Sequence, residues 1–162
     1  MKKYLFLILI IILIIILIIF IIKHRKIKII KGIQYFEFSY SQGYAMEANT
    51  IYKIEYTDKY IVYIKHTGSS EVKTFEISEN TVLIIEEVLN KYKIGAWDKF
   101  SKSDKHVLDG NSFHMYIRTK STNISVSGYE SWPKNYKYVK NILDSIFNDI
   151  ENGNEEKIYE KV

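Results

Sequence analysis

The sequence predicts an α+β fold in which a small antiparallel sheet packs on one face against two helices, after an N-terminal transmembrane helix. Three observations lead to this prediction. The chain begins with a long uncharged apolar run, its middle alternates apolar and polar residues as half-buried strands do, and two later stretches repeat apolar residues at helical spacing. Strands that cluster rather than alternate with helices favour an antiparallel sheet, so the expected order is β-β-β-β-α-β-β-α.

The apolar run Tyr4–Ile22 contains 19 residues without a charge, glycine or proline. As a helix it would span about 28 Å, close to the ~30 Å hydrocarbon core of a bilayer. Lys23, Arg25 and Lys26 follow it, and the first small residue is Gly32, so a signal-peptide cleavage site is missing. We therefore expect an uncleaved signal-anchor of a single-pass membrane protein, with the lipid bilayer as its partner through Tyr4–Ile22.

Charge divides the chain at Gly32. All seven Lys and Arg residues of the first part lie at the flanks of the anchor, whereas the remainder carries 16 basic and 19 acidic residues and is net −3. The flanking charge favours a cytoplasmic domain by the positive-inside rule. Because the remainder has no basic stripe, we expect no nucleic-acid partner. The chain has no cysteine, which excludes disulfides and thiolate chemistry.

Four strands are predicted after the anchor, each with apolar residues at every second position. Their apolar members are Phe36, Phe38 and Tyr40, then Tyr52, Ile54 and Tyr56, then Val62 and Ile64, then the segment Val72–Ile77. Asp58–Lys59 and Thr67–Ser70 supply turn residues between the later strands.

The period then changes to that of a helix. Ser78 is a suitable N-cap, and an apolar stripe follows with Glu86 and Glu87 pointing outward; Gly95 lies just beyond the expected end. The stripe consists of Val82, Ile85, Val88, Leu89 and Tyr92. A loop through Asp109–Gly110 comes next.

A hairpin and a second helix complete the predicted domain. The strands of the hairpin carry Phe113, Met115 and Ile117, then Ile124 and Val126. Pro133 opens the helix and Asn152–Gly153 ends it. The predicted organisation is therefore a transmembrane anchor with a short tail over 1–23, a basic juxtamembrane linker over 24–33, the α+β domain over 34–151 and a polar tail over 152–162.

The histidines and acidic residues of the domain do not form a catalytic or metal-binding pattern. His66, His106 and His114 lie far apart, without the short spacing typical of metal ligands, and no phosphate-binding glycine loop is present. We therefore predict no catalytic residue, no metal ligand and no cofactor. A hydrolase site assembled from distant residues, such as His106 or His114 with Asp109, stays open as an alternative.

Aromatic residues, turn residues and acids gather in two segments, Trp97–Asn111 and Gly128–Trp132. Aromatic rings with polar tips offer flat area to a sugar or a peptide, although Tyr is also an ordinary strand residue. The residues that we predict to form a binding face are Trp97, Asp98, Phe100, Asp109, Tyr129 and Trp132.

Several strings resemble a group of small uncharacterised proteins of Gram-positive, clostridia-like bacteria. The most specific are the turn Leu108–Phe113 and the segment Trp132–Tyr136, and the likeness covers most of residues 34–147. The resemblance implies a membrane-anchored or exported protein, so it favours an extracytoplasmic domain, opposite to the flanking charge. It implies no activity and no functional residues. The leading hypothesis is a non-catalytic binding or interaction module for an unknown protein or small ligand.

Overall fold

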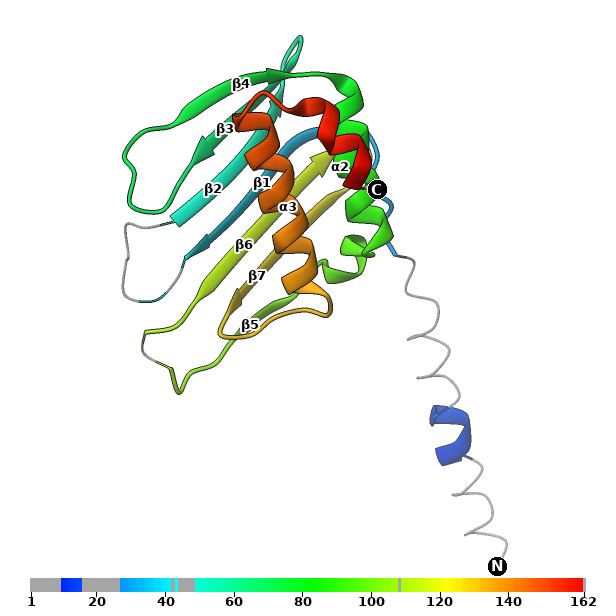
Figure 1. The fold of residues 1–162 in the computed structure, drawn as a ribbon. Helices are drawn as coiled ribbons and strands as arrows, with labels where there is room; N and C mark the ends of the chain where they lie inside the picture. The colour runs from blue at the N-terminus through cyan, green and yellow to red at the C-terminus, as the bar shows by residue number, and fades with distance from the viewer. Residues whose placement is uncertain (1–9, 16–26, 42, 44–48, 108, 162) are drawn as a thin grey trace, which may run out of the picture.

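The computed structural model describes residues 10–15, 27–41, 43, 49–107 and 109–161. Within them, seven strands form one sheet in the order β4-β3-β2-β1-β6-β7-β5 (Figure 1). The strands are β1 (Ile33–Ser41), β2 (Asn49–Tyr56), β3 (Tyr60–Lys65), β4 (Lys73–Ile77), β5 (Ser101–Ser103), β6 (Ser112–Thr119) and β7 (Asn123–Tyr129). The helices are α2 (Glu79–Lys91), α3 (Tyr136–Glu151) and the 3-10 helices η1 (Ile94–Trp97) and η2 (Glu155–Lys161). The class is therefore α+β.

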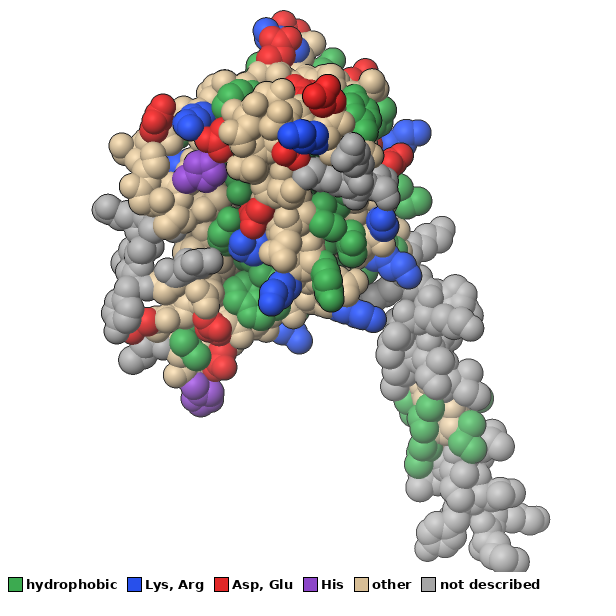
Figure 2. All heavy atoms as spheres, in the orientation of Figure 1, with side chains coloured by type: hydrophobic (Ala, Val, Ile, Leu, Met, Phe, Trp, Pro, Cys, Tyr) green, Lys and Arg blue, Asp and Glu red, His purple; other side chains and the backbone are tan. Residues whose placement is uncertain are grey.

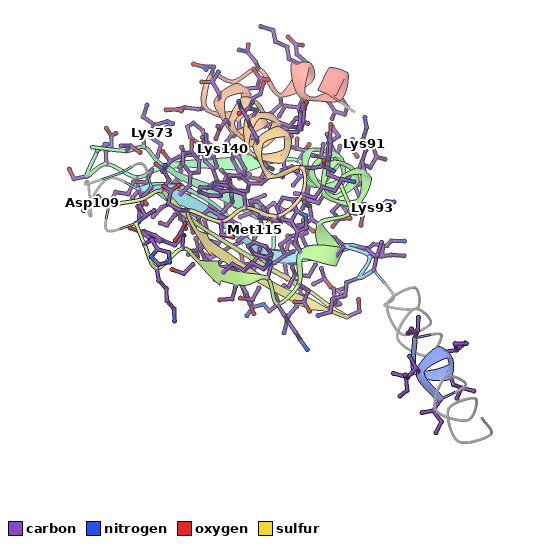
Figure 3. All side chains as sticks on the ribbon, turned by 90° about the horizontal axis from the view of Figure 1, so that it is seen from below. Lys73, Lys91, Lys93, Asp109, Met115 and Lys140 are labelled. Carbon is purple, nitrogen blue, oxygen red and sulfur yellow. The ribbon has the colours of Figure 1, made fainter. Side chains whose placement is uncertain are left out.

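The core lies between one face of the sheet and the helices, because the alternating apolar residues of the strands all point to that face. Phe36 of β1 and Tyr52 of β2 stack on Phe147 of α3, with ring centroids 6.0 Å and 4.3 Å away respectively. Met115 of β6 (Figure 3) is fully buried in this layer. Such aromatic pairs stabilise a core beyond the area they bury.

The predicted sheet is too small and of the wrong type. Besides the six predicted strands, the structure contains β5, which pairs with β7 in parallel and makes the sheet mixed. Ser101–Ser103 is exposed and has no apolar member, so it carries none of the alternation from which strands are predicted. It is a strand because its backbone continues the hydrogen bonding of β7.

The predicted transmembrane helix is also contradicted. In the described part of the chain, no helix is both long and apolar enough to cross a bilayer. Residues 10–15 are helical, and six residues rise only about 9 Å against the ~30 Å of a hydrocarbon core. The other residues of Tyr4–Ile22 lie outside the described ranges. This finding overturns the predictions of a membrane anchor and of single-pass membrane localisation.

The residues before β1, predicted as a linker, are fastened to the domain, and we call residues 27–32 the N-terminal strap. Asn90 of α2 accepts a hydrogen bond from the Ile30 amide (2.9 Å) and donates one to the Ile30 carbonyl (2.7 Å). Ile30 is fully buried, and Ile33 at the start of β1 donates its amide to Glu86 at 2.8 Å. Glu86, predicted to point outward, is consequently buried, with 5% of its surface exposed.

The other end of the chain also contacts the core. Residues 155–161, part of the predicted polar tail, form η2, and Ile158 is fully buried. The Thr81 hydroxyl of α2 donates a hydrogen bond to Glu155 at 2.7 Å. Both termini of the described domain therefore lie beside α2 (Figure 1).

The opposite face of the sheet is polar and half-exposed. Its side chains contact one another: the Tyr35 hydroxyl donates to Glu37 at 2.5 Å, and the Lys53 ammonium lies 4.9 Å from the centre of the Tyr63 ring. Burial, followed by the hydrogen bond to Glu37, raises the pKa of Tyr35. An antiparallel sheet with one solvated face is a common arrangement.

Candidate functional site

The residues of the predicted binding face separate into three groups. Trp97 lies in η1, only 6% exposed, with its ring 6.4 Å from that of Tyr136, and so belongs to the core. Asp98 binds the N-terminal strap. The remaining residues, Phe100, Asp109, Tyr129 and Trp132, lie around the β5 edge of the sheet and the turn after β7.

Asp98 fastens the strap to β7. Its carboxylate lies 2.8 Å from the Lys28 ammonium and accepts a hydrogen bond from the Ser125 amide at 3.3 Å. The same ammonium donates to the carbonyl of Asn123 at 2.7 Å. Although burial raises the pKa of Asp98, the hydrogen bonds from Lys28 and Ser125 outweigh it, and the net pKa lies below the ordinary value.

This lowered pKa predicts a pH-dependent contribution of Asp98 to stability. An acid whose pKa is lower in the folded state stabilises the fold above its unfolded pKa, and the contribution disappears as the pH falls through the folded pKa. Asp98→Asn should therefore lower the free energy of unfolding by about 1 kcal/mol at neutral pH. Urea titrations from pH 7 down to 3 should show the gap between variant and parent closing below about pH 4. A gap that stays constant over this range would contradict the assignment.

Trp132 is the exposed member of an aromatic cluster. With 39% of its surface exposed, it stacks on the buried Tyr136 at a centroid distance of 4.6 Å and an interplanar angle of 23°. Phe113 of β6 lies beneath both rings, 5.4 Å from Trp132 and 4.4 Å from Tyr136, and Phe100 is 6.5 Å from Phe113. The cluster holds one face of the Trp132 indole against the domain and leaves part of the ring available to a ligand.

An apolar pocket of about 450 Å³ opens beside this tryptophan. It is lined by Trp132, Pro133, Asn135, Tyr136, Lys137 and Tyr138. Asn135, the N-cap of α3, has a left-handed backbone (φ 67°), a conformation that asparagine tolerates better than most residues. This turn directs the chain from Pro133 into α3 and leaves Tyr138, 67% exposed, at the wall of the pocket.

A polar groove of about 600 Å³ lies at the β5 edge of the sheet. It is lined by residues 101–106 together with Glu130 and Ser131. The tight reversal at Ser131 requires Gly128, since a Cβ there would lie 2.1 Å from the Ser131 carbonyl oxygen. The groove and the pocket have no lining residue in common, but Ser131 lines the groove and the next residue, Trp132, lines the pocket, and we call the two together the cleft.

Hydrogen bonds connect the walls of the cleft to the sheet. The Asp104 amide donates to the Tyr129 carbonyl at 2.9 Å, and the Tyr129 hydroxyl accepts from the Gly110 amide at 2.7 Å. Glu130 accepts from the backbone amide of Asn111 and, at 2.8 Å, from its side-chain amide. Tyr129 thus positions the loop that carries Asp109, while Asp109 itself is exposed at the periphery of the molecule (Figure 3).

A second polar network holds α3 on the sheet next to the cleft. Asp144 accepts hydrogen bonds from the hydroxyls of Tyr40 (2.8 Å) and Tyr52 (3.1 Å) and from the ammonium of Lys140 (2.7 Å; Figure 3). Burial, followed by the charge of Asp144, raises the pKa of Tyr52. Burial also raises the pKa of Tyr136. Tyr40 and Tyr52 thus serve as hydrogen-bond donors that hold Asp144, and with it α3, on the sheet.

The residues considered for a hydrolase site do not converge. His114 lies on the polar face of the sheet, 3.9 Å from Glu37, whereas His106 lines the polar groove. Among the described residues, no hydrogen bond or ion pair joins either histidine to Asp109, and no three His, Asp or Glu side chains gather closely enough to hold a metal ion. The described contacts of His106, His114 and Asp109 thus do not bring them together in the arrangement that the alternative of a hydrolase site needs.

Sequence reasoning identifies Trp132 but misses most of the pocket beside it. The helical pattern places Pro133, Tyr136, Lys137 and Tyr138 at the start of a helix, and only the string Trp132–Tyr136 indicates anything unusual. The helix begins at Tyr136 rather than at Pro133. Trp132 and Pro133 therefore precede the helix and line the pocket.

No protein-family model matches the sequence, and no curated protein is significantly similar to it. The resemblance described above therefore stays a prediction.

Proposed function

We propose that this chain is a non-catalytic binding module whose cleft takes up an extended segment of a partner protein. The observation that carries the proposal is Trp132: it is exposed, it is held on a buried tyrosine, and it lines an apolar pocket, while the preceding residue Ser131 lines a polar groove. Tryptophan and tyrosine in such positions dominate the energetics of protein interfaces.

The two halves of the cleft suit different parts of an extended chain. The pocket, at about 450 Å³, has room for one or two apolar side chains beside Trp132 and Tyr138. The groove presents hydroxyl and charged groups from residues 101–106, which are suited to the polar backbone of the same segment. A peptide that places a large side chain in the pocket and extends along the groove would use both halves.

Replacement of Trp132 tests the proposal. Peptides would first be selected on the full-length chain from a random display library, and their affinities measured by isothermal titration calorimetry. Trp132→Ala should weaken the selected peptides about 30-fold, equivalent to about 2 kcal/mol, because it removes the aromatic contact.

Tyr159→Ala is the matched control for this experiment. Tyr159 is 53% exposed and lies on η2, outside the cleft, so its removal should leave the affinities unchanged. Selection of no peptide, or equal binding by the Trp132→Ala variant, would refute the proposed function.

A further inference from the structure

We infer that the partner segment is acidic around the side chain that enters the pocket; this inference rests on the proposed function. The cleft is bordered by more basic than acidic residues. Lys102 and Lys105 line the groove and Lys137 lines the pocket, against two lining acids, Asp104 and Glu130; a fourth lysine, Lys134, follows the pocket residue Pro133 in the chain. This excess is local, since the chain from Gly32 onward is net negative.

The lysines of the cleft are available to a ligand, unlike several lysines elsewhere. Lys28, Lys53, Lys59, Lys73 and Lys140 each form an ion pair with an acid of the domain. Within the described ranges, Lys105, Lys134 and Lys137 have no such partner and are exposed. Lys102 lies over the Phe100 ring, its ammonium 5.5 Å from the ring centre. Basic and hydrophobic side chains accordingly adjoin around the lower end of α3 in Figure 2.

The two acids of the cleft are engaged in local hydrogen bonds. Asp104 accepts from the backbone amide of His106 at 3.0 Å, and Glu130 accepts from Asn111. Each therefore stabilises its own loop, and part of its charge is compensated by these donors. The lysines are left as the groups that a ligand would meet.

The start of α3 adds to this positive potential. Its first turn contains no acidic residue, and in the described structure its N-cap makes no side-chain hydrogen bond. A helix N-terminus carries a partial positive charge that an acidic residue in the first turn commonly offsets. Here Lys134 and Lys137 occupy that region, so carboxylates of the ligand would take the place of the missing acids.

An acidic protein segment fits better than a nucleic acid. Four lysines are few for a phosphate backbone, whose binding strength comes from many such contacts. The pocket beside Trp132 instead requires an apolar side chain. The expected ligand is an extended segment with a large apolar or aromatic side chain flanked by Asp or Glu.

The test compares each selected peptide with a version in which every Asp and Glu is replaced by Asn and Gln. On the full-length chain, the amide peptides should bind about tenfold more weakly, and this difference should shrink at high salt. The double variant Lys134→Gln/Lys137→Gln should bind the acidic peptides about tenfold more weakly than the parent does, and its affinity for the amide peptides should change little.

Lys120→Gln/Lys157→Gln is the control with the same change of net charge. Lys120 lies in the turn at the opposite end of the β6–β7 hairpin, and Lys157 lies on η2, so this variant should bind like the parent. Equal binding of acidic and amide peptides that still depends on Trp132 would overturn the inference and leave the proposed function standing. Tighter binding of a single-stranded oligonucleotide, lost in Lys134→Gln/Lys137→Gln, would overturn it in favour of nucleic acid.

Discussion

Replacing Trp97 with alanine is expected to lower the free energy of unfolding by about 4 kcal/mol, the usual cost of emptying a large aromatic site in a core. Trp97 is 6% exposed, and η1 presses it against the aromatic cluster through Tyr136. The loss should appear in urea unfolding followed by circular dichroism. Because Tyr136 also lines the pocket, we expect weaker peptide binding as a secondary consequence of lost packing.

Trp132→Ala is the matched substitution at the other tryptophan. Trp132 is 39% exposed, so its removal should cost at most about 1.5 kcal/mol of stability while it removes most of the binding affinity. Trp97→Ala should therefore mainly lower the free energy of unfolding, whereas Trp132→Ala should mainly lower the affinity for the peptides. A folded Trp97→Ala variant of unchanged stability would show that Trp97 is not part of the core.

The contrast between the tryptophans shows where prediction from sequence reaches its limit. Both lie in segments without periodicity, so nothing local indicates which one is buried. The strands and helices are predictable because their burial repeats along the chain: Phe36 and Phe38 mark β1, and Ser78 caps α2 by accepting from the Thr81 amide at 3.1 Å.

Other features depend on contacts between distant parts of the chain. Glu86 adjoins the apolar stripe of α2 and is predicted to face solvent, yet it is buried because it accepts the Ile33 amide, 53 residues away in sequence. A buried amide without a hydrogen-bond acceptor would cost free energy, and the Glu86 carboxylate supplies that acceptor. The sequence around Glu86 gives no indication of this distant partner. The candidate cleft is of the same kind, because β5, the turn after β7 and the start of α3 are brought together only by the sheet.

Gly95→Ala is expected to cost about 3 kcal/mol, because a side chain at this position would collide with the N-terminal strap. A Cβ on Gly95 would lie 1.7 Å from the carbonyl oxygen of Lys28 and 2.6 Å from its carbonyl carbon. Both are backbone atoms, so no rotation of a side chain relieves the collision. The strap must move, and the pairing of Ile30 with Asn90 moves with it. Urea unfolding measures the cost.

Gly153→Ala separates this steric cost from the general effect of replacing glycine. Gly153 has a positive φ of 71°, and a Cβ on it would meet no atom within 4 Å, so alanine there should cost only the backbone strain, about 1 kcal/mol. If Gly95→Ala lowers the free energy of unfolding no more than Gly153→Ala does, the strap can shift to accommodate the new side chain without a stability cost.

The double variant Gly95→Ala/Asn90→Ala tests whether displacement of the strap is the cause. Alone, Asn90→Ala should cost about 2 kcal/mol, since it leaves the amide and the carbonyl of buried Ile30 without their partner. If alanine at position 95 has already lifted the strap from α2, those two hydrogen bonds no longer exist to be lost. The two substitutions should then cost clearly less together than the sum of their separate effects, and strict additivity would mean that the strap keeps its contact with Asn90.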